Sequence, residues 1–367
     1  MCVVIACSLL HVWLRDNCRC SICYHAVAEE RILDSSSISL DIQPKSVTLN
    51  SAQEVVEVGW ATEDAHNSNY AFDFLEQYSG LANDSEETGL KLWNVAAIER
   101  DLPELPRVPY DSIMTDEKGV LTWLEKLNTY GFTILTGVPY GHKRVEEVGR
   151  RISIIRNSFW GESSWDVEDI PDPTSLSLTG GALFPHTDLC FSDSQPGIQF
   201  LHCLEFSADK IKGGESTIVD GCFVAEKIRH DNPEAFKVLS TQSIAHVFSS
   251  EKHHFRFDGP VIRLDPADGS VKELRYNQTL IAPLNHASKE LYAALQLFAR
   301  ETRSLENLLH FRLKEGDMLV FNNRRMMHGR TTYNTVNTCR HLEGCYLDFE
   351  EFQGRLKKLR ENSAAAA

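Results

Sequence analysis

Two histidines and one aspartate, far apart in the sequence, could together bind a redox-active metal. His186 and Asp188 form an H-x-D triplet, and His328 lies in the later stretch Phe321–Arg330. Two histidines and one carboxylate are the facial set that holds non-haem Fe(II) and leaves positions open for a co-substrate and O2. An H-x-D triplet alone often arises by chance, and any single histidine can be structural or on the surface. The three residues in this order are more specific, and we interpret them as iron ligands.

Arg340 follows His328 closely in the sequence. A guanidinium at that place could bind the far carboxylate of a 2-oxo acid through two parallel hydrogen bonds. The alternative is an ordinary surface arginine. Together with the three candidate ligands, Arg340 predicts oxygenase chemistry that uses a 2-oxo acid as co-substrate.

The elements that must position these residues are strands and helices in alternation. His186 and Asp188 are two residues apart, so on a strand end both side chains can point to one metal. Helical spacing of apolar residues marks 143–157, and the sequence Asn-Pro-Glu at 232–234 predicts a helix start. Buried strands are predicted at 130–138, 197–204, 216–219 and 317–321. The pattern indicates a mainly β protein with helices.

Composition excludes several classes of function. The chain has 367 residues, a formal net charge of −15, 42% hydrophobic and 24% charged residues. This acidic balance argues against nucleic-acid or anionic-membrane partners. No apolar run approaches the ~18 residues of a membrane span. The apolar residues 1–10 lack a positive region before them, so we interpret them as a core strand and not as a signal peptide.

Three of the ten cysteines lie close together, at Cys18, Cys20 and Cys23. This cluster with scattered single cysteines favours a metal site in a reducing compartment over a disulfide framework. The alternative is a set of free, reduced cysteines.

At these motifs the chain resembles a known family. It is similar to the γ-butyrobetaine dioxygenase and trimethyllysine dioxygenase family, within the taurine-dioxygenase-like group of Fe(II)/2-oxoglutarate oxygenases. The resemblance runs from near residue 12 to near residue 360. The matching stretches are 13–24, 186–188, 197–203, 213–221, 328–330 and 340–344.

The resemblance implies a double-stranded β-helix (jelly-roll) catalytic domain with a small zinc-binding β domain before it. We expect the zinc-binding domain at residues 1–90, where strand-like runs alternate with polar turns. Residues 91–112 are rich in turn formers and predict a surface linker. The catalytic domain then spans residues 113–367.

The resemblance also assigns the remaining ligands and co-substrate contacts. His328 is implied as the distal iron ligand on a separate strand. Leu201 and Ser216 are implied to assist Arg340 with 2-oxoglutarate. His66 is implied as the fourth ligand of a Cys₃His zinc site, which is closed and therefore structural.

The substrates of the family carry a trimethylammonium group, which aromatic faces recognise best. Trp160, Trp165 and Tyr346 stand where the family has aromatic cage residues, with core packing as the alternative for each. Asn277 aligns with a contact to the substrate carboxylate, or is simply a turn asparagine. Ser177 departs from the family, which has a tyrosine in this stretch, so the cage is incomplete or the substrate differs.

The expected activity is hydroxylation of a small quaternary-ammonium compound, γ-butyrobetaine to L-carnitine. The alternatives are trimethyllysine hydroxylation and a non-catalytic, ligand-binding member of the family. The expected cofactors are Fe(II), 2-oxoglutarate, structural zinc and ascorbate, with O2 and a small betaine as partners. We expect a homodimer in the cytoplasm, with mitochondria as the alternative compartment.

Overall fold

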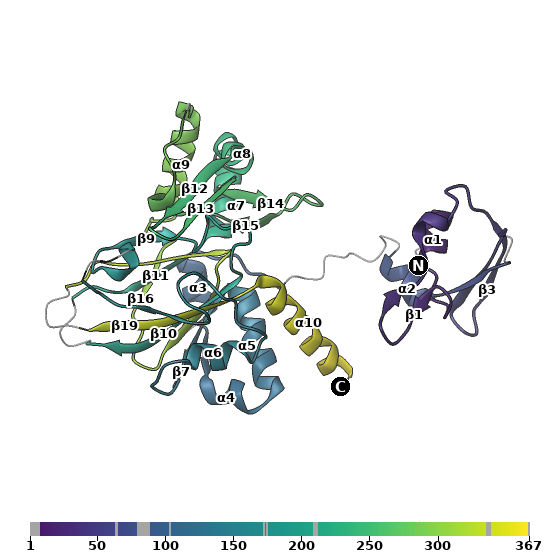
Figure 1. Ribbon diagram of the computed structural model, residues 1–367, viewed down its shortest axis with the longest axis horizontal. Helices are drawn as coiled ribbons and strands as arrows, with labels where there is room; N and C mark the ends of the chain where they lie inside the picture. Colours follow the sequence, from purple (N-terminus) through teal and green to yellow (C-terminus); the bar gives the residue numbers. More distant parts are fainter. Residues whose placement is uncertain are drawn as a thin grey trace. The chain divides into compact units, whose positions relative to one another are not determined.

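The structure is a computed structural model of the chain, and it divides into two compact units, residues 1–88 and 89–367. It describes residues 8–62, 65–78, 89–102, 104–171, 173, 175–207, 212–285, 287–334 and 339–365 (Figure 1).

The first unit is built on a three-stranded antiparallel sheet of order β3-β4-β5. Its small core contains the buried residues Ile42, Val58, Trp60 and Tyr70. The predicted core strand at residues 1–10 falls mostly outside the described residues, and a helix follows from His11. The elements are α1 (His11–Asp16), β1 (Tyr24–His25), β2 (Glu30–Arg31), η1 (Ser35–Ser37), β3 (Pro44–Asn50), β4 (Val55–Trp60), β5 (Asn67–Ala71) and α2 (Phe72–Tyr78).

Two β-sheets form the centre of the second unit. The larger has the order β6-β7-β17-β10-β19-β8, and the smaller has the order β16-β11-β18-β9. Apolar residues of both sheets, such as Phe321 and Ile218, share one core cluster, as expected for a double-stranded β-helix. The strands are β6 (Arg107–Pro109), β7 (Phe132–Thr136), β8 (Trp165–Val167), β9 (Leu183–His186), β10 (Ile198–Phe206), β11 (Ser216–Asp220), β16 (Leu309–Phe311), β17 (Met318–Asn322), β18 (Met326–Arg330) and β19 (Arg340–Leu347).

Helices cover the outer face of the larger sheet. Trp123 and Leu356, from two of these helices, pack with Phe200 and Val320 of the sheet. This layer shields one face of the strands, so their other face can line a site. The helices outside the later insertion are α3 (Val95–Asp101), α4 (Tyr110–Thr115), α5 (Glu117–Tyr130), α6 (Arg144–Gly149) and α10 (Phe349–Ala365).

An insertion between β11 and β16 forms a separate layer with its own core, and Figure 1 shows it in green. Its described residues contain three α-helices and two hairpins, and the segment 277–280 between the second hairpin and the last helix lines the cavity described below. Its elements are α7 (Gly221–Asp231), α8 (Pro233–Thr241), β12 (Ile244–Ser249), β13 (His254–Gly259), β14 (Ile262–Leu264), β15 (Val271–Leu274), η3 (Gln278–Leu280) and α9 (Lys289–Glu301). The predicted helix start is present, since Asn232 caps α8 and Pro233 is its first residue.

The predicted linker at 91–112 is wrong. This segment belongs to the second unit and contains α3, β6 and the start of α4. Trp93 and Ile98 are each only 2% exposed, and the indole N–H of Trp93 donates to the carbonyl of Tyr130. Closely spaced prolines suggested an exposed connection, but they separate short elements that are packed into the core. The helix expected over 143–157 is also shorter, because α6 ends at Gly149, whose α-carbon packs closely against Ile155.

Candidate active site and zinc site

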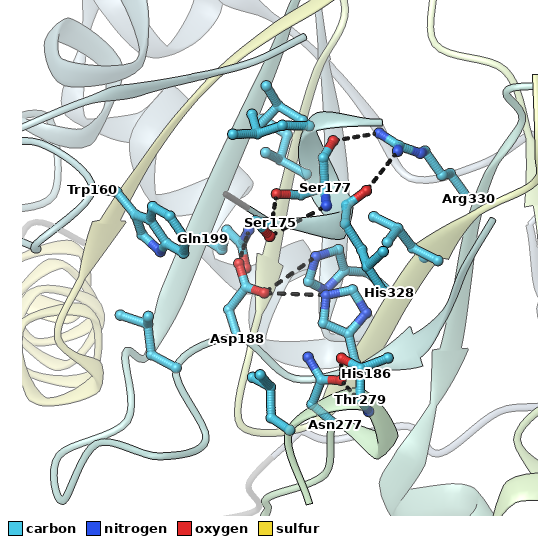
Figure 2. Close-up of a pocket in the computed structure, with 18 of the residues that line it drawn as sticks. Trp160, Ser175, Ser177, His186, Asp188, Gln199, Asn277, Thr279, His328 and Arg330 are labelled. Carbon is cyan, nitrogen blue, oxygen red and sulfur yellow. Dashed lines mark hydrogen bonds and ion pairs between the residues drawn. The ribbon is translucent and has the colours of Figure 1, made fainter. Parts of the chain in front are cut away.

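Pairing between two strands of the smaller sheet brings the two histidines together. β9 and β18 are antiparallel, and His186 lies directly opposite His328. Asp188 follows β9 in a turn. Its Oδ1 lies 3.2 Å from His186 Nε2 and 3.9 Å from His328 Nε2. All three ligand atoms lie within 4.8 Å of one another, so the structure assembles the predicted facial set (Figure 2).

Both imidazoles are arranged to present Nε2 to a metal. Nδ1 of His186 lies 2.8 Å from the carbonyl oxygen of Phe184, so Nδ1 carries the proton and Nε2 is left free. Burial, reinforced by the nearby His186, lowers the pKa of His328 to about 3. His328 is therefore neutral at physiological pH, the form that binds metals.

Asp188 is held by hydrogen bonds on its backbone and on one carboxylate oxygen. Its Oδ2 accepts from Gln199 Nε2 at 2.8 Å and from Tyr346 Oη at 2.7 Å. The side chain of Asn323 bonds both the N–H and the carbonyl of Asp188, at 2.8 and 3.1 Å. Burial alone would raise the pKa of Asp188, but the two histidines and Tyr346 together hold it below its usual range. The carboxylate is thus ionised, and Oδ1 faces the histidines.

The facial set opens into a cavity of about 780 Å³. Arg340 lines it at the start of β19 and is buried, and its Nε has no hydrogen-bond partner among the described residues. A buried cation is costly to desolvate unless an anion pairs with it. Leu201 and Ser216 also line the cavity. These residues therefore fit the carboxylate of a 2-oxo acid.

Arg330 holds one wall of this cavity, a role that the sequence interpretation did not assign. Its guanidinium donates to the carbonyls of Gly181, Ser177 and Leu176, at 3.2, 2.9 and 3.2 Å, and also to that of Thr179. These carbonyls belong to η2 (Leu176–Leu178) and the residues after it. The H-G-R sequence marked Arg330 as part of a motif, but a carbonyl-binding arginine has no spacing rule that reveals its target.

The three predicted cage aromatics line the cavity. Trp165 and Tyr346 stack on each other with centroids 4.0 Å apart, so each ring covers one face of the other. The indole of Trp165 lies over Gly344, where an added Cβ would come within 2.8 Å of it. Trp160 packs against Phe159 with centroids 4.4 Å apart.

Two polar residues complete the lining near these rings. The hydroxyl of Ser177 donates to that of Ser175 at 2.9 Å, so this part of the wall is polar. Asn277 lines the cavity and also caps η3, since its Oδ1 accepts from the N–H and hydroxyl of Thr279. The capping agrees with the interpretation of Asn277 as a turn residue, and its contact with a substrate carboxylate stays a prediction.

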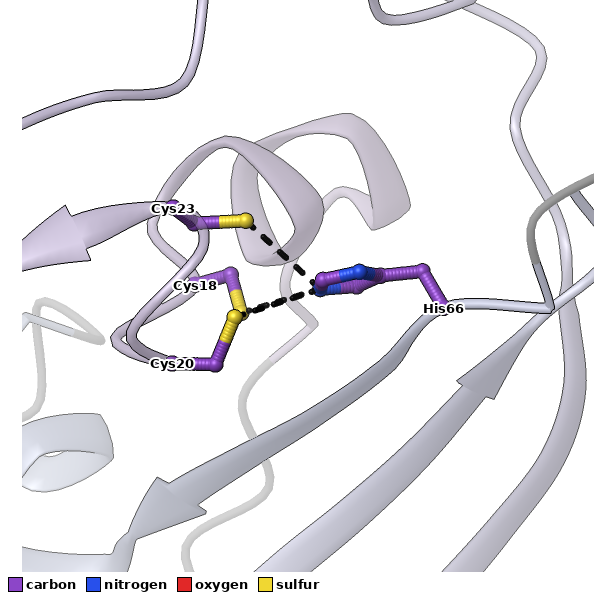
Figure 3. A group of neighbouring side chains, drawn as sticks. All are labelled: Cys18, Cys20, Cys23 and His66. Atoms are coloured by element: carbon purple, nitrogen blue, oxygen red, sulfur yellow. Dashed lines mark hydrogen bonds between the residues drawn. The ribbon is translucent and has the colours of Figure 1, made fainter.

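A second group of metal-binding side chains lies in the first unit (Figure 3). Nε2 of His66 lies 3.3, 3.7 and 3.6 Å from the sulfurs of Cys18, Cys20 and Cys23. Tetrahedral zinc with usual bond lengths places N and S ligands about 3.5 Å apart. Arg15 was not predicted, and its guanidinium donates to the Cys23 sulfur at 3.3 Å. The four residues therefore fit a closed zinc site.

Burial acts against the thiolate form of one of these cysteines. Burial raises the pKa of Cys23 to about 11, although the hydrogen bond from Arg15 opposes this shift. A thiolate at neutral pH therefore needs further positive charge beside it, and a metal ion would supply that charge.

Comparison with known proteins defines the family. The sequence model of the family described as "Taurine catabolism dioxygenase TauD, TfdA family" matches residues 96–346. A second one, "Gamma-butyrobetaine hydroxylase-like, N-terminal", matches residues 6–76. The chain belongs to the TauD/TfdA dioxygenase family and is a dioxygenase.

Relatives cover almost the whole chain. A gamma-butyrobetaine dioxygenase of Pseudomonas sp. (strain AK-1) is 33% identical over 94% of this chain and 89% of its own length. The Homo sapiens gamma-butyrobetaine dioxygenase is 30% identical over 95% and 90%. The mitochondrial trimethyllysine dioxygenase of Bos taurus is 30% identical over 92% and 79%. The predicted resemblance is therefore confirmed.

Solved structures share the fold. An asparagine oxygenase in complex with Fe(II), a hydroxyasparagine and succinate has a TM-score of 0.51 at 15% identity, over 66% of this chain and 94% of its own. A taurine dioxygenase from Burkholderia xenovorans has a TM-score of 0.50 at 14% identity, over 63% and 82%. The predicted catalytic fold is confirmed. Within the described residues, no helix is both long and apolar enough to cross a membrane.

Proposed function

We propose that the chain hydroxylates γ-butyrobetaine to L-carnitine, using Fe(II) and 2-oxoglutarate. The observation that carries this proposal is the convergence of three kinds of group on one cavity: the facial set at His186, Asp188 and His328, the buried Arg340, and the stacked pair Trp165–Tyr346. The gamma-butyrobetaine dioxygenases of Pseudomonas sp. and Homo sapiens, both relatives of this chain, support the same substrate.

Separate residues of the cavity would bind the iron and the co-substrate. His186, Asp188 and His328 hold the iron, and Arg340 binds the distal carboxylate of 2-oxoglutarate through its planar fork. When bound, Fe(II) with 2-oxoglutarate and O2 supplies the oxidation, in which one oxygen atom enters a substrate C–H bond as hydroxyl and the other enters succinate as CO2 leaves.

Substrate binding falls to the other side chains of the cavity. The rings of Trp165, Tyr346 and Trp160 would contact the trimethylammonium, which offers no hydrogen-bond donor. The amide of Asn277 would donate to the substrate carboxylate. Leu201 and Ser216 would assist Arg340.

Trimethyllysine is the second candidate because trimethyllysine dioxygenases are also among the relatives. Its α-ammonium group would require an acidic partner. Among the described residues that line the cavity, the acids are Asp166 and Asp188. Asp188 serves the metal, and Asp166 is bonded to His341 at 2.7 Å. The cavity therefore suits γ-butyrobetaine better.

The test is a turnover assay on the full chain with Fe(II), 2-oxoglutarate and O2. We expect succinate and L-carnitine to form in equal amounts with γ-butyrobetaine. Trimethyllysine should give less product, and no added substrate should give only slow succinate release. Iron binding with no succinate above background for either substrate would support the non-catalytic alternative.

We further propose zinc as the ion of the Cys18, Cys20, Cys23 and His66 site, because these donors fit a tetrahedral Cys₃His set. From the family resemblance we also propose ascorbate dependence, a homodimer and a cytoplasmic location. Activity with and without ascorbate, mass in solution, and localisation of a tagged full-length protein test the three in turn.

A further inference from the structure

Gln199 is buried in an unfavourable way. It lies on β10 and is only 2% exposed, and its Oε1 has no hydrogen-bond partner among the residues that the structure describes. A buried carbonyl oxygen without a donor destabilises a fold, and an apolar side chain of similar size would avoid that loss. The presence of an amide here therefore requires a reason other than packing.

The amide nitrogen of Gln199 supplies that reason. Nε2 of Gln199 donates to Oδ2 of Asp188 at 2.8 Å. The orientation of the amide follows from chemistry, because an ionised carboxylate only accepts hydrogen bonds and must face the NH₂ group. The unpaired Oε1 is thus the consequence of aiming the donor at a candidate iron ligand.

The strand register places a second hydrogen-bond donor to Asp188 beside Gln199. Gln199 lies directly opposite Tyr346 on the adjacent antiparallel strand β19, so both side chains point to the same face. Tyr346 Oη donates to the same oxygen at 2.7 Å. With two donors on Oδ2, the carboxylate presents Oδ1 to His186 and His328, at the distances given above (Figure 2).

We propose that Gln199 is a positioning residue for the iron site: it fixes Asp188 so that one oxygen faces the metal while the other stays occupied by protein donors. A carboxylate free to rotate would have to be ordered each time the metal binds, so loss of this restraint would weaken iron ligation. The proposal rests on iron ligation by His186, Asp188 and His328, but not on the identity of the substrate.

The test compares iron affinity with thermal stability in Gln199→Met. Methionine has a similar length and neither donates strongly nor leaves an orphan carbonyl. The Fe(II) Kd of the zinc-loaded full chain is measured under nitrogen by competition with an Fe(II)-selective chelator. We expect the Kd to rise by about 10- to 100-fold, the usual effect of losing a partner of a metal ligand. The melting temperature should not fall.

Gln195 provides a matched control. It is also fully buried with an unpaired Oε1, but its Nε2 donates to the backbone carbonyls of Leu274 and Asn323 and not to a metal ligand. Gln195→Met should leave the Fe(II) Kd within about twofold of wild type, since its amide bonds no ligand side chain. Tyr346→Phe removes the second donor and should weaken iron binding as well.

If Gln199→Met does not fold, Gln199→Asn takes its place in the test. This variant keeps the amide but shortens its reach, so it should also weaken iron binding. An unchanged Fe(II) Kd in a folded Gln199 variant would overturn the role of Gln199 alone. A wild-type chain that does not bind Fe(II) would overturn the metal assignment itself. The two failures are therefore distinguishable.

Discussion

The chain contains two groups of metal-binding side chains that differ in donor number and in surroundings. The group in the first unit has four donors, three of them cysteine sulfurs, in a largely buried cluster. The group in the second unit has three donors and opens into a cavity of about 780 Å³. Four protein donors fill a tetrahedral zinc shell, whereas three leave room for reacting ligands. The comparison suggests that one metal would stabilise the protein and the other would react.

The surroundings of the two groups follow the same division. At the closed group, the guanidinium of Arg15 donates to the sulfur of Cys23 and places positive charge beside it. At the open group, Gln199 and Tyr346 donate hydrogen bonds to one oxygen of Asp188. The buried Arg340 has an Nε that is unpaired among the described residues and could bind an anion in the cavity. The first set of contacts neutralises charge, and the second orients ligands.

The largest expected effect is the loss of one ligand from the open group. His186→Ala leaves an incomplete facial set, and we expect turnover to fall by more than about 100-fold, beyond the usual effect of changing a residue that bonds a metal ligand. The melting temperature should change little. Coupled succinate and product formation measure the turnover rate, and thermal unfolding measures the melting temperature. An active His186→Ala enzyme would refute the iron site.

Loss of a ligand from the closed group should have the opposite profile. Cys20→Ser should remove about one zinc per chain and destabilise the first unit, because zinc ligation contributes about 10–16 kcal/mol in small zinc peptides. Elemental analysis and thermal unfolding measure these effects. Cys339→Ser is the control, since Cys339 lies outside both metal-binding groups. A zinc-free wild type of normal stability would contradict the assignment.

Many of the metal-binding residues in the two groups were predictable from the sequence, because metal ligands belong to few residue types and follow short spacings. His186, Asp188 and the three clustered cysteines were found in this way. The pairing of His186 with His328 depends on the register of β9 and β18, which no local pattern contains. The resemblance supplied that long-range part, together with His66.

The residues that support the site were less predictable. Gln199, Asn323 and Arg330 act through hydrogen bonds to groups that are distant in sequence, and amides and arginines are also common on surfaces. The linker prediction failed for a related reason. Prolines indicate where regular structure is interrupted, but not whether the short elements between them are buried.

A smaller effect is expected at the co-substrate end of the open site. Arg340→Lys keeps the charge but loses the planar fork, so the KM for 2-oxoglutarate should rise about tenfold, equivalent to about 1.4 kcal/mol. The KM for γ-butyrobetaine should stay nearly constant. Arg312→Lys is the control, because Arg312 bonds Glu215 and does not line the cavity. An unchanged co-substrate KM would exclude this role for Arg340.

The loss of one indole should have a comparable or slightly smaller effect on the substrate. Trp165→Ala removes one aromatic ring, and a cation–π contact contributes about 1 kcal/mol where it is exposed and about 2 kcal/mol where it is desolvated. Substrate binding should therefore weaken roughly tenfold, since about 1.4 kcal/mol corresponds to a factor of ten. Trp165→Phe keeps a ring face and should recover much of the loss. Equal binding by Trp165→Ala and wild type would show that the ring only packs in the core.

The smallest effect concerns the polar wall at Ser177. The backbone carbonyl of Ser177 is held by Arg330 and its hydroxyl bonds Ser175, so this wall offers oxygen atoms and no π face. Wild type should therefore select the trimethyl group only weakly over dimethyl and unmethylated analogues. Ser177→Tyr adds a ring, and an exposed cation–π contact of about 0.5–1 kcal/mol corresponds to about a two- to fivefold gain in preference.

Competition between γ-butyrobetaine and its dimethyl and unmethylated analogues measures this preference in both proteins. Ser177→Ala is the matched control, because it removes the hydroxyl without adding a ring, and its preference should stay near that of wild type. A gain in Ser177→Tyr would place the ammonium group beside η2, between the wall held by Arg330 and the stacked pair. An equal preference in all three proteins would place the ammonium group elsewhere in the cavity, because a ring at residue 177 could not then contact it.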